Sequence, residues 1–338
     1  MKFGIWQPIF GGWLRNIENE NMPATFEYTK KVAQEAERLG FEITLIAELY
    51  LNDIKGQEAE AMEAWTTAAA IAAVTEKIEI LTALRPGYHN PAVTAKMISN
   101  IDQISGGRFS LNLVSAWWEE EARQYGGMFT AHDERYDRTA EFIDVIRGLW
   151  NQTPFSYKGK FYDLENTYME PKPLKRPIIY AGGESPKGKE TIVNHCDAYV
   201  MHGGTVEEIR TKIQEMKDLR AAAGKEPLQS FGMAAYVIAR DKEEEVQAEL
   251  ARITDVKDAA GYIGFKDFTT KSQLEQEIAL RDYSVSNRGL RPELFGTPEQ
   301  IAKKLKEYED AGLDFVLLQF SPQLEEMEYF AEKVMPLV

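Results

Sequence analysis

The chain has 338 residues and a formal net charge of −15, from 39 lysines and arginines against 54 aspartates and glutamates. A chain this acidic lacks the Lys/Arg surface that binding to a phosphate backbone requires, so no nucleic-acid partner is expected. Its single cysteine, Cys196, excludes an internal disulfide, and no run approaches the ~18 apolar residues of a membrane helix. The N-terminal stretch is too short and interrupted for a signal peptide, so we expect a soluble, cytoplasmic protein without a membrane partner.

Short apolar runs alternate with amphipathic segments along most of the chain. The strand-like runs are 3–6, 43–46, 78–84, 109–115, 178–181, 198–201, 231–239 and 315–320. The segments with helical periodicity are 26–39, 61–74, 92–104, 135–149, 187–195, 206–222 and 298–311. Thr297 and Pro298 form a helix-start signal, while Gly40 and Gly312 stand where a glycine commonly ends a helix.

The alternation of strands and helices favours a parallel sheet. Eight strand candidates also match the number that closes a (β/α)8 TIM barrel, with an open doubly wound sheet as the alternative. Two segments exceed a minimal barrel: about 151–175, which is hairpin-like, and about 255–294, a lid-like stretch between strands seven and eight. We expect both at the mouth of the site and, without a linker, one domain over residues 1–338.

The fourth strand carries the first candidate site residue. Alternation places Asn112 on the opposite face from Phe109, Leu111 and Leu113, so that it points into the barrel near its C-terminal end. An asparagine bonded to neighbouring backbone and one that faces a ligand both fit this position. Ser115 follows directly, and Glu121 lies a few residues further on.

Two segments have the features of a phosphate site. Gly182 and Gly183 follow the fifth strand and precede a helix whose backbone N–H groups attract an anion; Ser185 would take part, or would only cap that helix. Arg135 and Tyr136 would donate to the same phosphate; the alternative is a charged helix start capped by Asp133.

Other site chemistries are less well supported. The four histidines have no metal-ligand spacing and Cys196 has no cysteine partner, so no metal site is expected. His195 and Cys196 are placed at the N-terminal face of the barrel and interpreted as structural. Carboxylates at strand ends, Glu48 and residues 119–121, would suit a glycosidase, although an acidic chain scatters carboxylates everywhere.

Several motifs occur together in one order along the chain. They are residues 33–41, 84–87, 91–96, 101–109, 112–117, 132–136, 180–185 and 295–300. On these residues the chain resembles the bacterial luciferase-like flavin-dependent monooxygenases across nearly its whole length. Within that family, residues 6–13 and 114–117 are most similar to dimethylsulfone monooxygenase, with alkanesulfonate monooxygenase and pyrimidine oxygenase as near relatives in pattern.

The resemblance implies a cofactor and partners. The barrel would bind reduced FMN supplied by a separate NAD(P)H-dependent flavin reductase, and would form a homodimer or homotetramer. With O2 it would oxidise a small organosulfur compound, sulfone- or sulfonate-like, or a related compound, through a C4a-(hydro)peroxyflavin. By position, the implied flavin-binding residues are Glu48, Leu49, Asn112, Ser115, Glu121, Arg135, Tyr136, Gly182, Gly183 and Ser185.

The chain also departs from its relatives. Leu49 stands where luciferase has its catalytic histidine, so light emission is not expected. An Arg-x-His of alkanesulfonate monooxygenase is replaced by residues 234–236, which end in Tyr236, and Arg288 or Arg291 is the counterpart of its loop arginine. Arg288, Arg291 and Tyr236 are the candidate catalytic residues. An F420-dependent oxidoreductase and a non-catalytic flavin-binding relative are the alternatives.

Overall fold

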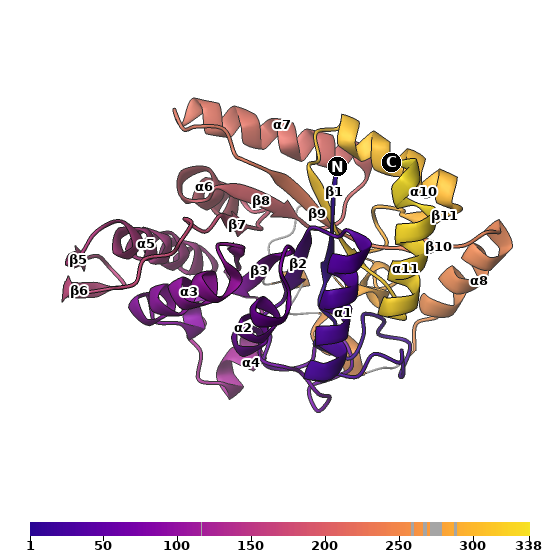
Figure 1. Cartoon of the computed structure of the whole chain (residues 1–338), viewed down its shortest axis with the longest axis horizontal. Helices are drawn as coiled ribbons and strands as arrows, with labels where there is room; N and C mark the ends of the chain where they lie inside the picture. Colours follow the sequence, from indigo (N-terminus) through magenta and orange to yellow (C-terminus); the bar gives the residue numbers. More distant parts are fainter. Residues whose placement is uncertain (116, 258–259, 266–268, 271–278, 287–288) are drawn as a thin grey trace.

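The computed structural model describes residues 1–338 except 116, 258–259, 266–268, 271–278 and 287–288 (Figure 1). Eight parallel strands close into a barrel in the order β1-β12-β9-β8-β7-β4-β3-β2. They are β1 (Lys2–Trp6), β2 (Ile43–Ile46), β3 (Glu79–Leu84), β4 (Phe109–Leu113), β7 (Ile179–Ala181), β8 (Ala198–Met201), β9 (Phe231–Tyr236) and β12 (Phe315–Gln319). The predicted TIM barrel is confirmed, and the open sheet is excluded because β1 pairs with both β2 and β12.

Helices surround the strands, as Figure 1 shows. They are α1 (Phe26–Leu39), α2 (Ala64–Val74), α3 (Pro91–Ser105), α4 (Glu119–Gln124), α5 (His132–Asn151), α6 (Pro186–His195), α7 (Val206–Ala222), α8 (Glu243–Ile253), α10 (Pro298–Asp310) and α11 (Gln323–Lys333). Short 3-10 turns are η1 (Pro86–Tyr88), η2 (Ala260–Tyr262), η3 (Asp282–Ser284) and η5 (Met335–Leu337). Helices α4, α8 and α11 were not predicted. Among the described residues no helix is both long and apolar enough to span a bilayer.

The expected helix signals have their expected geometry. The Thr297 side chain accepts from the Gln300 backbone N–H in a capping box, and Pro298 takes the first helical position of α10. Gly40 ends α1 with φ 92°, a left-handed conformation that side-chain-bearing residues rarely adopt. The alternative cap for α5 was wrong, because the helix begins at His132 after Ala131 and Asp133 lies in its first turn.

Strand alternation separates two cores. The barrel interior holds a small cluster made of Ile43, Leu45, Leu81, Tyr180, Ala198, Val200, Phe315 and Leu317. The intervening strand residues, such as Leu111 and Leu113 of β4, join the larger cluster that packs against the helices. Asn112, between them, therefore faces the barrel interior as predicted.

The two extra segments take different places. Strands β5 (Phe155–Lys158) and β6 (Asp163–Thr167) form the predicted antiparallel hairpin, but at the edge of the molecule beside α5 (Figure 1). Its turn is held by Glu141 of α5, which accepts from the backbone N–H groups of residues 160–162. The placement of this segment at the mouth of the site was wrong, since none of its residues lines the cavity described below. The second segment contributes η2, η3 and part of the cavity wall, and it is followed by β11 (Phe295–Gly296), which pairs with β10 (Ile238–Ala239).

Candidate active site

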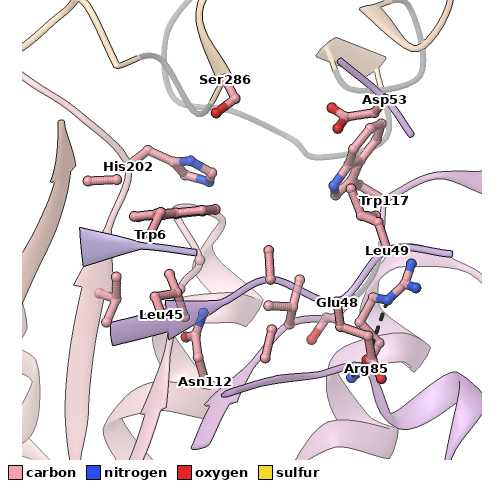
Figure 2. Close-up of a pocket in the computed structure, with 18 of the residues that line it drawn as sticks. Trp6, Leu45, Glu48, Leu49, Asp53, Arg85, Asn112, Trp117, His202 and Ser286 are labelled. Carbon is pink, nitrogen blue, oxygen red and sulfur yellow. Dashed lines mark hydrogen bonds and ion pairs between the residues drawn. The ribbon is translucent and has the colours of Figure 1, made fainter. Parts of the chain in front are cut away.

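The main cavity opens at the C-terminal ends of the barrel strands. Its empty volume is about 1420 Å³, a figure that includes space open to solvent at the mouth. Figure 2 shows Trp6, His202 and Asn112 on one side of this space, with Trp117, Asp53 and Leu49 on the other. The predicted flavin-binding residues that line it are Glu48, Leu49, Asn112, Ser115, Arg135, Tyr136, Gly182 and Gly183. Residues more than 130 positions apart in the sequence thus lie in one site. Flavin binding at this site stays a prediction.

The cavity wall presents buried polar atoms that have no hydrogen-bond partner among the described residues: an acceptor on Asn112 and donors on Trp6 and Arg85. Asn112 Oδ1 is buried and has no hydrogen-bond partner within the described part of the chain. The indole Nε1 of Trp6 is also buried and has no hydrogen-bond partner among the described residues. Buried polar groups are rarely left unpaired, and such exceptions call for a ligand or water. This part of the cavity is therefore suited to a planar ligand that carries both N–H donors and acceptors.

One end of the cavity gathers hydrogen-bond donors. The Arg135 guanidinium donates from Nε to the Ser115 carbonyl at 3.0 Å and from Nη1 to the Thr130 carbonyl at 2.7 Å. Burial lowers the pKa of Arg135, although Tyr136 and Glu119 oppose the shift. A Cβ on Gly183 would lie 3.1 Å from the Tyr136 hydroxyl, so a glycine lets the backbone approach that hydroxyl closely. This end can bind an anion through Arg135, Tyr136 and local backbone.

His132 also lines this end, and no role was predicted for it. Its Nδ1 lies 2.8 Å from the Asp133 carboxylate, while Nε2 is buried and lacks a partner among the described residues. Ser185, by contrast, does not line the cavity. Its hydroxyl accepts from the Gly188 backbone N–H at 3.1 Å and caps α6, which is the alternative that the sequence left open.

A buried charge cluster lies beside Glu48. Glu48 Oε2 accepts from the Arg85 backbone N–H at 2.7 Å, and its Oε1 lies 2.6 Å from His89 Nε2. The Arg85 guanidinium bonds to Glu121 and lies 3.5 Å from Glu48. Burial opposes the charge of Arg85, but Glu121 and Glu48 outweigh it and raise its pKa. The cluster fixes the Glu48 side chain at the cavity wall with its negative charge compensated.

Glu121 itself is turned away from the cavity. It is fully buried, and its carboxylate accepts from the backbone N–H of Tyr50 at 2.6 Å and from the Tyr88 hydroxyl at 3.2 Å. It is not a lining residue. In this structure it therefore acts on the site through Arg85 and the loop after β2, and not by the flavin contact that the resemblance implied.

Of the three candidate catalytic residues, Tyr236 and Arg291 are described, and neither lines the cavity. Tyr236 is buried outside it, among the residues that pack outward from β9, and burial raises its pKa well above 10.0. Its proposed catalytic contact is wrong for this structure, because Ala234 takes the lining position on that strand. Arg291 pairs with Glu208 of α7, with its Nε 3.0 Å from the carboxylate. Arg288 lies outside the described residues.

The mouth of the cavity holds charged residues that the sequence did not single out. Arg15 and Asp53 both line it and form an ion pair of 2.9 Å. Arg15 also stacks on the Tyr283 ring, 3.9 Å from its centroid. These residues come from three loops without periodicity, so the only signal was a charge after a strand, which an acidic chain offers in many places.

Neither metal nor thiol chemistry is supported by the described residues. Among them, no group of three or more His, Cys, Asp or Glu side chains could hold a metal ion. Cys196 is buried, and burial raises its pKa to about 12, so its thiol stays protonated at neutral pH.

Comparisons with known proteins agree with this fold. The family described as Luciferase-like monooxygenase matches residues 1–314. An FMNH2-dependent dimethylsulfone monooxygenase of Pseudomonas fluorescens (strain Pf0-1) is 34% identical, covering 100% of this chain and 94% of its own. Its counterpart in Pseudomonas putida is 35% identical, covering 100% and 95%. Among solved structures, the EDTA monooxygenase of Chelativorans sp. BNC1 superposes with a TM-score of 0.80 at 20% identity, covering 100% of this chain and 93% of its own, which shows a shared fold.

Proposed function

Because the chain belongs to the luciferase-like monooxygenase family, we propose that it binds reduced FMN and uses O2 to oxidise a small organosulfur compound. The support is similarity over the full chain to two relatives named FMNH2-dependent dimethylsulfone monooxygenases. Reduced FMN would be supplied by a separate NAD(P)H-dependent reductase. The single domain, the cytoplasmic location and the dimeric or tetrameric state expected from the sequence remain predictions.

The observation that supports FMN as the cofactor is that polar atoms on the inner wall of the cavity have no hydrogen-bond partner among the described residues. Asn112 Oδ1 is an acceptor and Trp6 Nε1 a donor, both buried and both without a partner among the residues described. The edge of an isoalloxazine ring offers N–H and carbonyl groups, which match this pair. Glu48 and Leu49 line the adjacent wall, where the ring would lie.

The opposite end of the cavity suits the phosphate group of FMN. Arg135 supplies a guanidinium, Tyr136 a hydroxyl and His132 a ring nitrogen, while Gly182 and Gly183 allow the backbone to approach. A phosphate bound there would sit beside the N-terminus of α5, whose dipole favours negative charge.

When bound, reduced FMN supplies the activation of O2 and the transfer of an oxygen atom to the substrate. The chain binds and orients the two and excludes water. Trp6, Trp13 and Trp117 line the space as large apolar walls. The Glu48 carboxylate stays fixed at that wall by Arg85 and His89. The course of the oxygen chemistry expected from the resemblance stays a prediction.

Anaerobic titration of the apo-protein with FMNH2 and, separately, with reduced F420 tests the cofactor. Oxygen uptake with FMNH2 is then measured with and without dimethylsulfone or methanesulfonate. FMNH2 binding together with substrate-stimulated uptake supports the proposal. Preference for reduced F420 would replace it with hydride transfer, and FMNH2 binding without any stimulation would favour a non-catalytic flavin-binding protein.

A further inference from the structure

The Arg15 guanidinium at the cavity mouth makes four hydrogen bonds within the described part of the protein. Its Nε donates to the Tyr283 carbonyl at 2.8 Å, and its Nη1 donates to the Gly261 carbonyl at 2.7 Å and to the Asp53 carbonyl. Its Nη2 donates to Asp53 Oδ2 at 2.9 Å, and its flat face lies on the Tyr283 ring. The side chain is 1% exposed. A ligand therefore meets an arginine whose charge is paired with Asp53 and four of whose five N–H donors are already in use.

Asp53 is the part of this pair that meets the cavity. Its side chain is 10% exposed against 1% for Arg15. Figure 2 shows the Asp53 carboxylate directed into the upper part of the space, on the same side as Trp117 and opposite Ser286. The mouth thus presents an anionic oxygen backed by a buried cation.

Other charged residues along the described wall also form ion pairs. Arg85 forms ion pairs with Glu121 and Glu48, while its Nε and Nη2 have no hydrogen-bond partner among the described residues. Glu184 is held by Lys212 at 2.5 Å. Arg135, which donates to the Ser115 and Thr130 carbonyls, lies at the phosphate end. Among the described residues, the lining between Asp53 and Ser286 therefore offers the rings of Trp117 and His202 and the Ser286 hydroxyl, and the arginine at this mouth, Arg15, is already paired.

We propose that Asp53 is a specificity-determining residue: by holding Arg15 and facing the cavity, it restricts the outer part of the site to uncharged substrates and excludes anions such as sulfonates. The choice of a sulfone and a sulfonate as the two probes rests on the proposed function, while the exclusion of anions does not. An anion entering this space would meet the Asp53 carboxylate across a medium of low dielectric constant. It would also have to break the Arg15–Asp53 pair to gain a donor, which leaves a buried carboxylate unpaired. A neutral sulfone pays neither cost, and its oxygens accept from hydroxyl or indole groups.

Asp53→Asn tests this directly. The asparagine oxygen still accepts from Arg15, and the bonds of Arg15 to Tyr283 and Gly261 remain, so the mouth keeps its shape while the charge disappears. Glu42→Gln is the matched control: it removes the same charge at an exposed residue beside Lys2, just before β2 and hence at the opposite end of the barrel. Binding of methanesulfonate and of dimethylsulfone to the apo-proteins is followed by tryptophan fluorescence, because Trp6, Trp13 and Trp117 line the cavity.

The expected result is that Asp53→Asn binds methanesulfonate more tightly than wild type does. Its affinity for methanesulfonate should rise by about tenfold or more over wild type, while Glu42→Gln stays at the wild-type value and dimethylsulfone changes less than about threefold in both. Wild-type protein that binds methanesulfonate as tightly as Asp53→Asn does overturns the proposal. So does an equal gain in Glu42→Gln, which would reflect net charge alone.

Two further variants keep the test open if Asp53→Asn fails to fold. Asp53→Ser also removes the charge and should gain methanesulfonate affinity, whereas Asp53→Glu retains it and should not. Because these measurements use apo-protein, a failure of FMNH2 binding or oxygen uptake would reject the proposed function without deciding the exclusion of anions. A wild-type protein that excludes methanesulfonate and a charge-free variant that admits it would support the exclusion whatever the enzyme's substrate proves to be.

Discussion

Glu121→Gln tests whether Glu121 contacts the flavin directly, as the resemblance implies, or supports the site through Arg85, as the structure indicates. The substitution keeps the size of the side chain and one oxygen that can accept from the Tyr50 backbone N–H. It removes the negative charge that faces Arg85. Because Glu121 is fully buried and does not line the cavity, the expected effect falls on stability first.

The size of that effect follows from the cluster. Removing one partner from a buried ion pair costs about 3–5 kcal/mol, and here Glu48 remains 3.5 Å from Arg85, so we expect about 3 kcal/mol. Unfolding entropy of about 2.1 cal/mol/K per residue over 338 residues gives about 0.7 kcal/mol per kelvin. The thermal midpoint should therefore fall by about 4 °C, measured by circular dichroism.

Glu120→Gln is the matched control on the same helix. Glu120 pairs with Arg123 on the exposed face of α4, and its loss should leave the thermal midpoint unchanged. FMNH2 affinity of Glu121→Gln should stay within about threefold of wild type under conditions where the variant is folded. A variant with an unchanged midpoint and lost FMNH2 binding would refute this reasoning and restore the direct contact.

Two other substitutions probe different parts of the molecule. Asn112→Leu removes the unpaired buried acceptor and should weaken FMNH2 binding by about tenfold, with no loss of thermal stability, as read from an anaerobic titration; unchanged affinity would contradict the assignment of Asn112 to the cofactor. Burial raises the pKa of Glu79 above its ordinary 4.5, although Ser110 donates to its carboxylate. Because its pKa is raised, Glu79 contributes stability at low pH that is lost as the pH rises. The free energy of unfolding of Glu79→Gln, measured in urea, should therefore increase relative to that of wild type between about pH 4 and about pH 7. A difference between the two proteins that stays constant over this range would contradict this reasoning.

Much of the fold was predictable because its signals are local. Each barrel strand is a short apolar run, and helices such as α10 carry their own caps at Thr297 and Pro298. The helices that were missed lack such signals. Helix α4 has six residues with three glutamates in its first turn, and α8 follows Lys242, whose side chain does not cap the helix. The edge position of the β5–β6 hairpin is a tertiary contact with Glu141, which no local pattern announces.

The candidate site divides in the same way. Asn112 was found because strand alternation alone decides which face it occupies. Tyr236 was misplaced because strict alternation puts it on the same face as Ala234, which lines the cavity. The alternation breaks at the end of β9, where Tyr236 joins its neighbours Ala235 and Val237 in the outer core. Arg15 and Asp53 are separated by 37 intervening residues in irregular loops, so that their ion pair appears only when β1 and β2 are side by side.

The net charge of −15 makes one further prediction about how the cofactor arrives. An acidic protein repels the FMN phosphate over long distances, whereas the donors that hold it, such as Arg135, are local and buried. Raising ionic strength from about 0.01 M to about 0.15 M shortens the Debye length from about 30 Å to about 8 Å, so it screens the repulsion more than the buried contacts. The association rate of FMNH2, measured by anaerobic stopped flow, should therefore rise with salt while the dissociation rate changes little. Reduced riboflavin, which lacks the phosphate, is the control and should show no such rise. An FMNH2 association rate that falls with salt would mean that a positive surface steers the cofactor, and would contradict the assignment of its affinity to local donors.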